Sequence, residues 1–388
     1  MNTPVDLNDN NAPELLDNRS QNEREVLALI RQHGALPKAT ISKMTGLSAQ
    51  SATVIIKKLE ADDLVKRLSP LKGAKGQPKI PFALNEDGAF SVGLKIGRRS
   101  YDMTLIDFVG NVVASLHERV DFPSVDSLLS FSQRAFNVVA SSLDQCLTTR
   151  IRGIGVAMPF EIWHWAEEAG APIEVLKQWQ QCDIASQLNA LLALPVFVRN
   201  DAAAACSAEL SFGNAHQWRN FLYIFVGTFV GGGLVLNGSL LEGKSGRAGA
   251  IGSLSLFNGK EVQQLIKQSS LYLLEQQLNA NGENGGLLYE HPSHWQCSPH
   301  EITTWISNAS QGLAYASHCA MSLLDLDGII IDGAMPNDVR QALVDTTQNA
   351  LSHLDMRGLP PITITAGNVG AKAQSIGSAN LPLLANYA

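Results

Sequence analysis

The amino-terminal part of the chain is defined by residues 46–59, which read GLSAQSATVIIKKL. Gly46 suits the end of a helix, because glycine readily adopts the left-handed conformation of a helix C-cap. Ser48 suits the start of the next helix, because its hydroxyl can accept a hydrogen bond from a backbone N–H of the first turn. Apolar residues then recur at helical spacing on one face, at Ala52, Ile55, Ile56 and Leu59. The stretch therefore predicts a turn and a helix that continues to about Asp62.

The flanking residues complete a small domain. An apolar stripe predicts a first helix from Asn22 to about Gly34. Pro37 suits the first position of a second helix over 38–45, with Ile41 and Met44 facing inward. Beyond Leu64-Val65, a glycine-rich basic turn over 72–78 leads to a return strand over 80–84. Three helices followed by a β-hairpin form a winged helix-turn-helix, which we assign to residues 21–84.

Charge is distributed unevenly along the 388 residues. Residues 21–82 hold eleven Lys or Arg against five acids, a balance of +6, whereas residues 83–388 carry −10. Residues 1–20 are polar and acidic, and they are predicted to be a disordered tail. A basic domain joined to an acidic body indicates a polyanion partner for that domain alone.

The third helix of this domain is the predicted DNA-reading element, because a helix fits the major groove and presents side chains to base edges. Gln50 can pair with adenine, whereas the two lysines at the end of the helix suit phosphates. The predicted DNA-binding residues are Ser48, Ala49, Gln50, Ser51, Thr53, Val54, Lys57 and Lys58 on the helix, and Lys72, Lys75 and Lys79 on the wing. A winged helix that binds protein, or a solvated amphipathic helix without a ligand, are the alternatives.

The remaining chain contains two similar halves. Three predicted strands over 91–120 are followed by a helix over roughly 124–148, a strand over 151–159, a helix over 183–192 and a strand at 195–201. A second set of strands begins at 221–241, and helices are predicted at roughly 260–280, 300–324 and 336–353. The pattern indicates an internal duplication at low sequence similarity.

Two observations bear on the location of the protein. Residues 221–241 carry no charge over a length that could span a membrane. Five glycines and the hairpin signal Asn237-Gly238 instead favour two buried strands. The five cysteines are scattered without CxxC spacing, and the amino terminus lacks the features of a signal peptide, so we expect a reduced, cytoplasmic protein without a membrane partner.

Four motifs in this order resemble the ROK family (repressors, open reading frames and sugar kinases), which has an actin/hexokinase-like fold. They are the GLS turn, VRNDA at 198–202, VGTFVGGG at 226–233 and GRAGAIG at 246–252. The resemblance covers roughly residues 20–388, and the domain order is similar to that of the family's sugar-responsive repressors. It implies an α/β fold class: a winged helix-turn-helix followed by a two-lobed ROK domain over 88–388, with a lobe boundary near residue 200.

The function implied by the resemblance is a DNA-binding transcriptional regulator, a repressor acting on a double-stranded operator. A small-molecule effector, a sugar or sugar derivative, is expected in the cleft between the lobes, and a homodimer or homotetramer is the expected assembly. The effector-binding residues implied are Asn200, Asp201, Glu161 and Ser253. In the family's kinases the aspartate of this Asn-Asp pair is a general base. The simpler interpretation is that Asn200 and Asp201 cap the following helix.

Departures from the family's kinases indicate that kinase activity is lost, so that the chain is not an enzyme and needs no cofactor. Lys95 stands where the kinases have an acid, and a cation cannot bind Mg²⁺. Phe229 stands where their phosphate loop has glycine. Ala250 and Ser253 replace a Glu and a His that contact sugar, and Phe160 replaces a glycine. The family's zinc cysteines are missing between Cys206 and Cys297, so no metal is expected. An active ATP-dependent sugar kinase with a DNA-binding domain, and an effector-independent regulator, are the alternatives.

Overall fold

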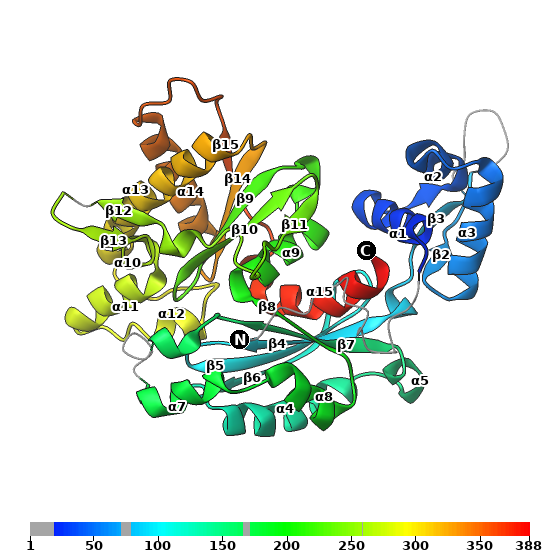
Figure 1. Ribbon diagram of the computed structural model, residues 1–388, viewed down its shortest axis with the longest axis horizontal. Coiled ribbons are helices and arrows are strands. Elements are labelled where there is room, and N and C mark those ends of the chain that lie inside the picture. Colours follow the sequence, from blue (N-terminus) through cyan, green and yellow to red (C-terminus); the bar gives the residue numbers. More distant parts are fainter. Residues whose placement is uncertain (1–18, 71–78, 166–170, 258) are drawn as a thin grey trace. The chain divides into compact units, whose positions relative to one another are not determined.

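The computed structural model describes residues 19–70, 79–165, 171–257 and 259–388. They form two compact units: the first contains residues up to Arg199 together with Ser375–Ala388, and the second contains Asn200–Gln374 (Figure 1). The chain therefore passes between the units twice. The sequence did not predict that the last residues belong to the first unit. The predicted disordered tail, residues 1–20, lies almost entirely outside the described residues.

The amino-terminal domain is a winged helix-turn-helix, as predicted. It contains α1 (Gln21–His33), α2 (Lys38–Thr45) and α3 (Ala49–Ala61), and a sheet in the order β1 (Leu36–Pro37), β3 (Pro81–Leu84), β2 (Val65–Arg67). Its core is formed by side chains that are at most 1 % exposed, among them Val26, Leu27, Ile30, Ile41 and Ile56. The prediction that Met44 faces inward was wrong, because the short α2 buries only Ile41 and leaves Met44 43 % exposed.

The main sheet of the first unit has the strand order β6-β5-β4-β7-β8. Strand β4 pairs antiparallel with β5 and parallel with β7. Helices α4 (Val125–Ala140) and α8 (Ile184–Leu192) cover one face, and α15 (Ala373–Tyr387) lies on the other (Figure 1). The strand bounds are β4 Phe90–Ile96, β5 Ser100–Ile106, β6 Val112–Arg119, β7 Ile151–Met158 and β8 Val196–Asn200. Helix α5 (Gln145–Thr148) is separate from α4, so the single helix predicted over 124–148 was wrong.

Helix α15 lies close to the sheet because two strand residues have no side chain. A Cβ atom at Gly93 would lie too close to Ser375 and Ser378, and a Cβ at Gly155 would overlap the Ser378 carbonyl. The Ser91 hydroxyl donates a hydrogen bond to the Ala379 carbonyl at the same contact. The glycines of β4 and β7 thus fix where the carboxyl-terminal helix lies in the first unit.

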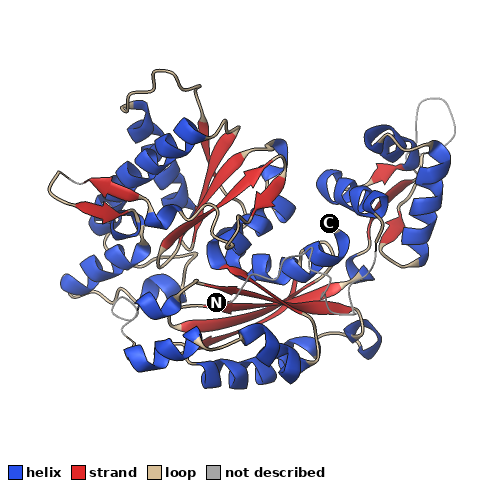
Figure 2. Cartoon of the chain, in the orientation of Figure 1, coloured by secondary structure: helices blue, strands red, loops and turns tan. Residues whose placement is uncertain are grey.

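The sheet of the second unit repeats the arrangement of the first, with the order β11-β10-β9-β14-β15. In both sheets the first three strands along the chain are antiparallel. A fourth strand then pairs in parallel with the first, and a fifth lies beyond the fourth at the edge of the sheet. The predicted duplication is therefore visible in the topology (Figure 2). The bounds are β9 Phe221–Val226, β10 Val230–Leu236, β11 Ser239–Leu241, β14 Gly328–Gly333 and β15 Thr363–Ala366. Helices α9 (Asp201–Phe212), α13 (Pro299–Leu323) and α14 (Asn337–Ser352) pack in this unit.

The helix predicted over 260–280 was wrong in its first half. Residues Val262–Gln264 form β13, which pairs with β12 (Ser255–Phe257), and two helices follow, α10 (Ile266–Ser269) and α11 (Leu271–Ala280). Ser270 is extended and separates them, because its hydroxyl accepts a hydrogen bond from Val230 N. The short helix α12 (Leu287–Glu290) follows α11. The first unit contains one further short helix, α7 (Ile173–Lys177).

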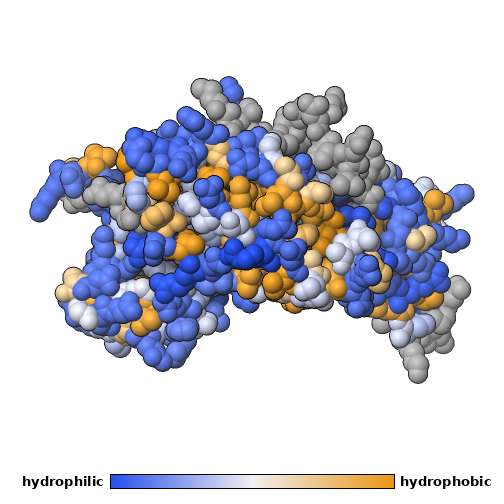
Figure 3. All heavy atoms as spheres, turned by 90° about the horizontal axis from the view of Figure 1, so that it is seen from below, coloured by the Kyte–Doolittle hydropathy of each residue, from blue (hydrophilic) through white to orange (hydrophobic). Residues whose placement is uncertain are grey.

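The face drawn in Figure 3 carries hydrophobic patches among hydrophilic side chains. Within the ranges that the structure describes, no helix has both the length and the apolar character needed to cross a membrane. The uncharged stretch 221–241 forms strands, as predicted, but three of them, β9, β10 and β11, rather than two.

Candidate DNA-binding and effector sites

The first turn of α3 presents small polar side chains to solvent. Ser48 caps the helix, since its Oγ accepts a hydrogen bond from Ser51 N at 3.0 Å. Ala49, Gln50 and Ser51 are exposed. Val54, one turn further on, is 62 % exposed. Thr53 is half-buried, and its hydroxyl donates to the Ala49 carbonyl at 2.8 Å.

The two lysines of α3 differ in their surroundings. Lys58 Nζ lies 2.7 Å from Glu23 Oε1, and the Glu23 side chain is only 3 % exposed. Glu23 also caps α1, because its Oε2 accepts a hydrogen bond from Ser20 N at 2.8 Å. Burial alone raises the pKa of Glu23, but Lys58 and Ser20 outweigh burial and hold that pKa below its ordinary value. Both lysines are exposed, but Lys58 also ties α3 to the start of α1.

The wing carries one described residue of the predicted set. Lys79 is exposed, and Lys72 and Lys75 lie outside the described residues. At the base of the wing, Arg67 pairs with Glu60 and Lys66 pairs with Glu86. These pairs neutralise cations near β2.

Asn200 and Asp201 lie together at the amino terminus of α9. Asn200 Oδ1 accepts hydrogen bonds from Ala202 N at 3.1 Å and Ala203 N at 3.3 Å, so the residue caps the helix. Asp201 Oδ1 accepts from Ala202 N at 2.9 Å, and Asp201 Oδ2 accepts from Gln374 Nε2 at 2.9 Å. Both side chains are half-buried. The capping interpretation accounts for the bonds to Ala202 and Ala203, and the bond to Gln374 is one that the sequence did not suggest.

The other two predicted effector residues do not join this pair within one unit. Glu161 belongs to the first unit, just beyond β7, and has a left-handed backbone with φ of 55°. Ser253 is exposed in a short 3-10 turn, Ile251–Ser253. A Cβ at Gly231 would approach Ala202 of α9, whereas one at the next residue, Gly232, would approach Ile251. Because successive strand residues point to opposite faces, α9 and the turn that holds Ser253 contact opposite faces of β10.

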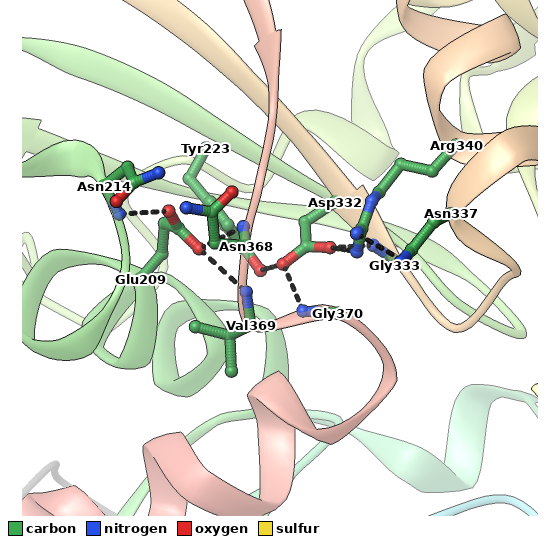
Figure 4. A network of polar contacts seen from close by, with 10 residues as sticks. All are labelled: Glu209, Asn214, Tyr223, Asp332, Gly333, Asn337, Arg340, Asn368, Val369 and Gly370. Atoms are coloured by element: carbon green, nitrogen blue, oxygen red, sulfur yellow. Dashed lines mark hydrogen bonds and ion pairs between the residues drawn. The ribbon is translucent and has the colours of Figure 1, made fainter. Parts of the chain in front are cut away.

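A buried polar network joins the loops at the ends of β14 and β15 (Figure 4). Asp332 is completely buried, and its carboxylate pairs with Arg340 Nη1 at 2.6 Å. The same carboxylate accepts hydrogen bonds from Tyr223 Oη at 3.1 Å, Gly333 N at 2.8 Å and Gly370 N at 2.9 Å. The pKa of Tyr223 is raised well above its ordinary value, mainly by burial and to a smaller extent by the charge of Asp332. The phenol therefore keeps its proton and acts as a hydrogen-bond donor. An acid inside the apolar run GIIIDG was the sequence signal for this site.

Glu209 completes the network from α9 (Figure 4). Its carboxylate accepts hydrogen bonds from Asn214 N at 3.0 Å, Asn368 N at 2.9 Å and Val369 N at 3.3 Å. Burial raises the pKa of Glu209, and these N–H groups oppose that effect. Together Asp332 and Glu209 hold residues 368–370, which lead directly into α15.

Comparisons with known proteins show what this chain is similar to. The model of the ROK family matches residues 91–262, and the model of the MarR family matches residues 20–71. A solved ROK family transcriptional regulator, described as a homologue of the E. coli MLC protein, superposes with a TM-score of 0.67 at 20 % identity, covering 94 % of this chain and 96 % of that one.

Over residues 91–262 the chain is similar to the ROK family.

Two relatives of this chain extend the comparison. The uncharacterised protein y4fQ of Sinorhizobium fredii is 23 % identical over 385 residues, which cover 95 % of this chain and 92 % of the relative. The xylose repressor of Bacillus subtilis is 24 % identical over 239 residues, 61 % of each chain, so the match spans less than two thirds of that repressor. A solved ROK glucokinase from Streptomyces griseus, in complex with glucose and AMPPNP, has a TM-score of 0.58 at 20 % identity and covers 76 % of this chain and 99 % of that one.

Two of the positions that were predicted to depart from the kinases make contacts inside their own units. Lys95 Nζ lies 3.5 Å from Asp102 Oδ2, and the ring of His117 contacts the other oxygen of that carboxylate at 2.6 Å. Burial raises the pKa of Asp102, but Lys95 and His117 outweigh it and lower that pKa. Phe229, in the turn between β9 and β10, packs edge-on against Tyr272 of α11 with 5.5 Å between ring centroids. Among the residues described, no three His, Cys, Asp or Glu side chains are grouped to hold a metal.

Proposed function

We propose that the chain is a transcriptional regulator that binds double-stranded DNA through α3, with Ala49, Gln50, Ser51 and Val54 toward base edges. The observation that carries this proposal is the exposed first turn of α3. The domain that holds α3 has a net charge of +6 over residues 21–82, although the whole chain has a net charge of −7. The xylose repressor of Bacillus subtilis is a relative with this function in its name, which supports repression. Lys57 and Lys79 supply phosphate contacts, and Lys72 and Lys75 remain proposed wing contacts.

We further propose that a sugar or sugar derivative controls DNA binding, with Asn200 and Asp201 as the hydroxyl-binding pair. Carboxylate and amide groups at a helix amino terminus can hydrogen-bond sugar hydroxyls, and both side chains are half-buried rather than sealed. Glu161 and Ser253 are retained as proposed contacts. A homodimer or homotetramer is the proposed assembly, because paired domains match two half-sites one helical turn apart.

Loss of kinase activity is part of the proposal. The ammonium of Lys95 is already directed to Asp102, and it gives the end of β4 a charge that repels Mg²⁺. The ring of Phe229 takes up space in the turn after β9. The second candidate is an active sugar kinase, which is favoured by Asp201 and by the fold shared with the glucokinase.

One experiment separates these functions. The full-length chain is used to select duplexes from a random library, and its affinity for the selected duplex is measured from 50 to 200 mM salt. The same protein is incubated with Mg-ATP and D-xylose, D-glucose or N-acetylglucosamine in a coupled assay. We expect selection of a common sequence, with affinity falling steeply as salt rises, and no turnover above background. A protein that selects no duplex, or that phosphorylates a sugar, contradicts the proposal.

A matched pair of variants tests the roles of the two lysines. Lys57→Gln is expected to weaken binding to every duplex and to reduce the salt slope by about one, because one phosphate contact is lost. Lys58→Gln is expected to lower the thermal midpoint as well, because the buried Glu23 loses its partner. The affinity and the melting temperature are measured for both proteins. If the two variants melt at the same temperature, the structural role of Lys58 is wrong.

A further inference from the structure

Helix α15 is continuous between the two units. The chain passes from the first unit to the second at Arg199–Asn200, and it returns inside α15 between Gln374 and Ser375. Both crossings meet in the second unit, where Gln374 Nε2 donates to Asp201 Oδ2 at 2.9 Å. A residue proposed to bind the effector is therefore hydrogen-bonded to the first turn of α15.

The start of α15 is held firmly by the second unit. Asp332 accepts the Gly370 N–H and Glu209 accepts the N–H groups of Asn368 and Val369 (Figure 4). A 3-10 turn, Gly370–Lys372, connects these residues to α15. Movement of this loop therefore moves the first turn of the helix rather than being absorbed by slack in the chain.

The far end of α15 contacts the DNA-binding domain. Tyr387 packs edge-on against Phe108, with 4.9 Å between ring centroids, and the guanidinium of Arg31 in α1 lies 5.0 Å from the centroid of the same Phe108 ring. Arg31 also donates to the Phe108 carbonyl at 2.8 Å, and Arg24 donates to the Ala385 carbonyl at 3.3 Å. Burial lowers the pKa of Arg31 to about 10, a value at which the side chain stays charged at neutral pH. We call Arg24, Arg31, Phe108 and Tyr387 the α1 junction.

From these contacts we infer that Gln374 is a positioning residue for regulation. A ligand that hydrogen-bonds Asp201 displaces the Gln374 amide, and α15 transmits the released constraint to the α1 junction, which sets how the DNA-binding domain is held. This inference rests on the proposed function, since Asp201 is the proposed effector contact. The side chain of Gln374 would thus couple the proposed effector contact at Asp201 to the α1 junction, and allostery requires such a coupling between two sites.

The test replaces Gln374 by an isosteric acid. Gln374→Glu places a like charge beside Asp201 and breaks the hydrogen bond at constant volume. The matched control is Gln341→Glu in α14, because Gln341 Nε2 also donates to an acid of the second unit, Asp345 Oδ1, at 2.8 Å. Hydrogen exchange of residues 21–33 and affinity for the duplex selected by the unmodified chain are measured on full-length proteins, and melting temperatures establish that both variants fold.

Gln374→Glu is expected to speed exchange in α1 and to change DNA affinity at least about five-fold, whereas Gln341→Glu leaves both as in the unmodified chain. If Gln374→Glu does not fold, Gln374→Met, which removes the amide without adding charge, gives the same comparison. Equal behaviour of the Gln374 and Gln341 variants overturns the inference while leaving DNA binding intact. Failure of the unmodified chain to bind any duplex rejects the proposed function instead, and the exchange comparison still decides whether Gln374 and α1 are coupled.

Discussion

Replacing Arg340 with methionine is expected to destabilise the second unit by about 3–5 kcal/mol, because removal of one partner leaves a buried charge without compensation. Asp332 has no exposed surface, and Arg340 Nη1 is its closest cationic group at 2.6 Å. The remaining donors, Tyr223 and the N–H groups of Gly333 and Gly370, carry no formal charge. Methionine fills a similar volume to arginine, so the loss of stability comes from the missing charge rather than from a cavity.

Urea unfolding followed by tryptophan fluorescence measures this effect, since Trp218, Trp295 and Trp305 lie in the second unit. Arg357→Met is the matched control in the same unit, because Arg357 also pairs with an aspartate, Asp355, but on the surface. An exposed pair contributes little, so the control is expected to unfold at the same urea concentration as the unmodified protein. A midpoint for Arg340→Met equal to that of Arg357→Met contradicts the assigned role of the buried pair.

Substitution of Gly155 by alanine is expected to cost about 3 kcal/mol and to loosen α15 from the first sheet. The new Cβ would overlap the carbonyl oxygen of Ser378 and lie 2.7 Å from its carbon. Backbone atoms of a packed helix cannot rotate away as a side chain can, so the strand or the helix must shift. Gly155 has no left-handed backbone, and steric overlap is therefore the whole effect.

The melting temperature of the full chain measures this change, and Gly286→Ala provides the control. At Gly286 the nearest atom to an added Cβ is Asn284 Oδ1 at 3.2 Å, the end of a flexible side chain. We expect little change for the control and a fall of several degrees for Gly155→Ala. We also expect Gly155→Ala to speed hydrogen exchange in α1, because the α1 junction includes Tyr387. A variant that melts with the control would show that α15 is not tightly packed at β7.

The local features of the DNA-binding domain were predictable from the sequence. Ser48 and Gly46 mark the helix boundaries through hydrogen bonds and dihedral angles set within a few residues, and the structure has both caps. The repeated sheets were also predictable, because each begins with three strands and tight turns. The inward position of Met44 was not, since a helix of only two turns exposes residues that a longer amphipathic pattern would bury.

The contacts that connect distant segments could not be predicted. Glu23 and Lys58 belong to different helices, and Gln374 is 173 residues from Asp201. Hydrophobic periodicity reports which face of an element is buried but does not identify the polar partner on another element. For the same reason the resemblance predicted Asn200 and Asp201 as effector contacts, but nothing in the sequence pointed to Gln374 as their neighbour. The helix predicted over 260–280 failed because Val262–Gln264 pair as a strand with Ser255–Phe257. Ser270 then interrupts the remaining helix and accepts a hydrogen bond from Val230 N, on a strand earlier in the chain.

The return of residues 375–388 to the first unit has a consequence for synthesis. At about 5–20 residues per second, the ribosome takes roughly 9–35 seconds to make residues 200–374 after the strands of the first sheet have been completed. During that interval the face of β4 and β7 that holds Gly93 and Gly155 lacks its covering helix. A nascent chain interrupted anywhere in the second unit therefore keeps this apolar face open to chaperones and proteases. The amino-terminal domain gains its contact with Tyr387 only after residues 375–388 have been made.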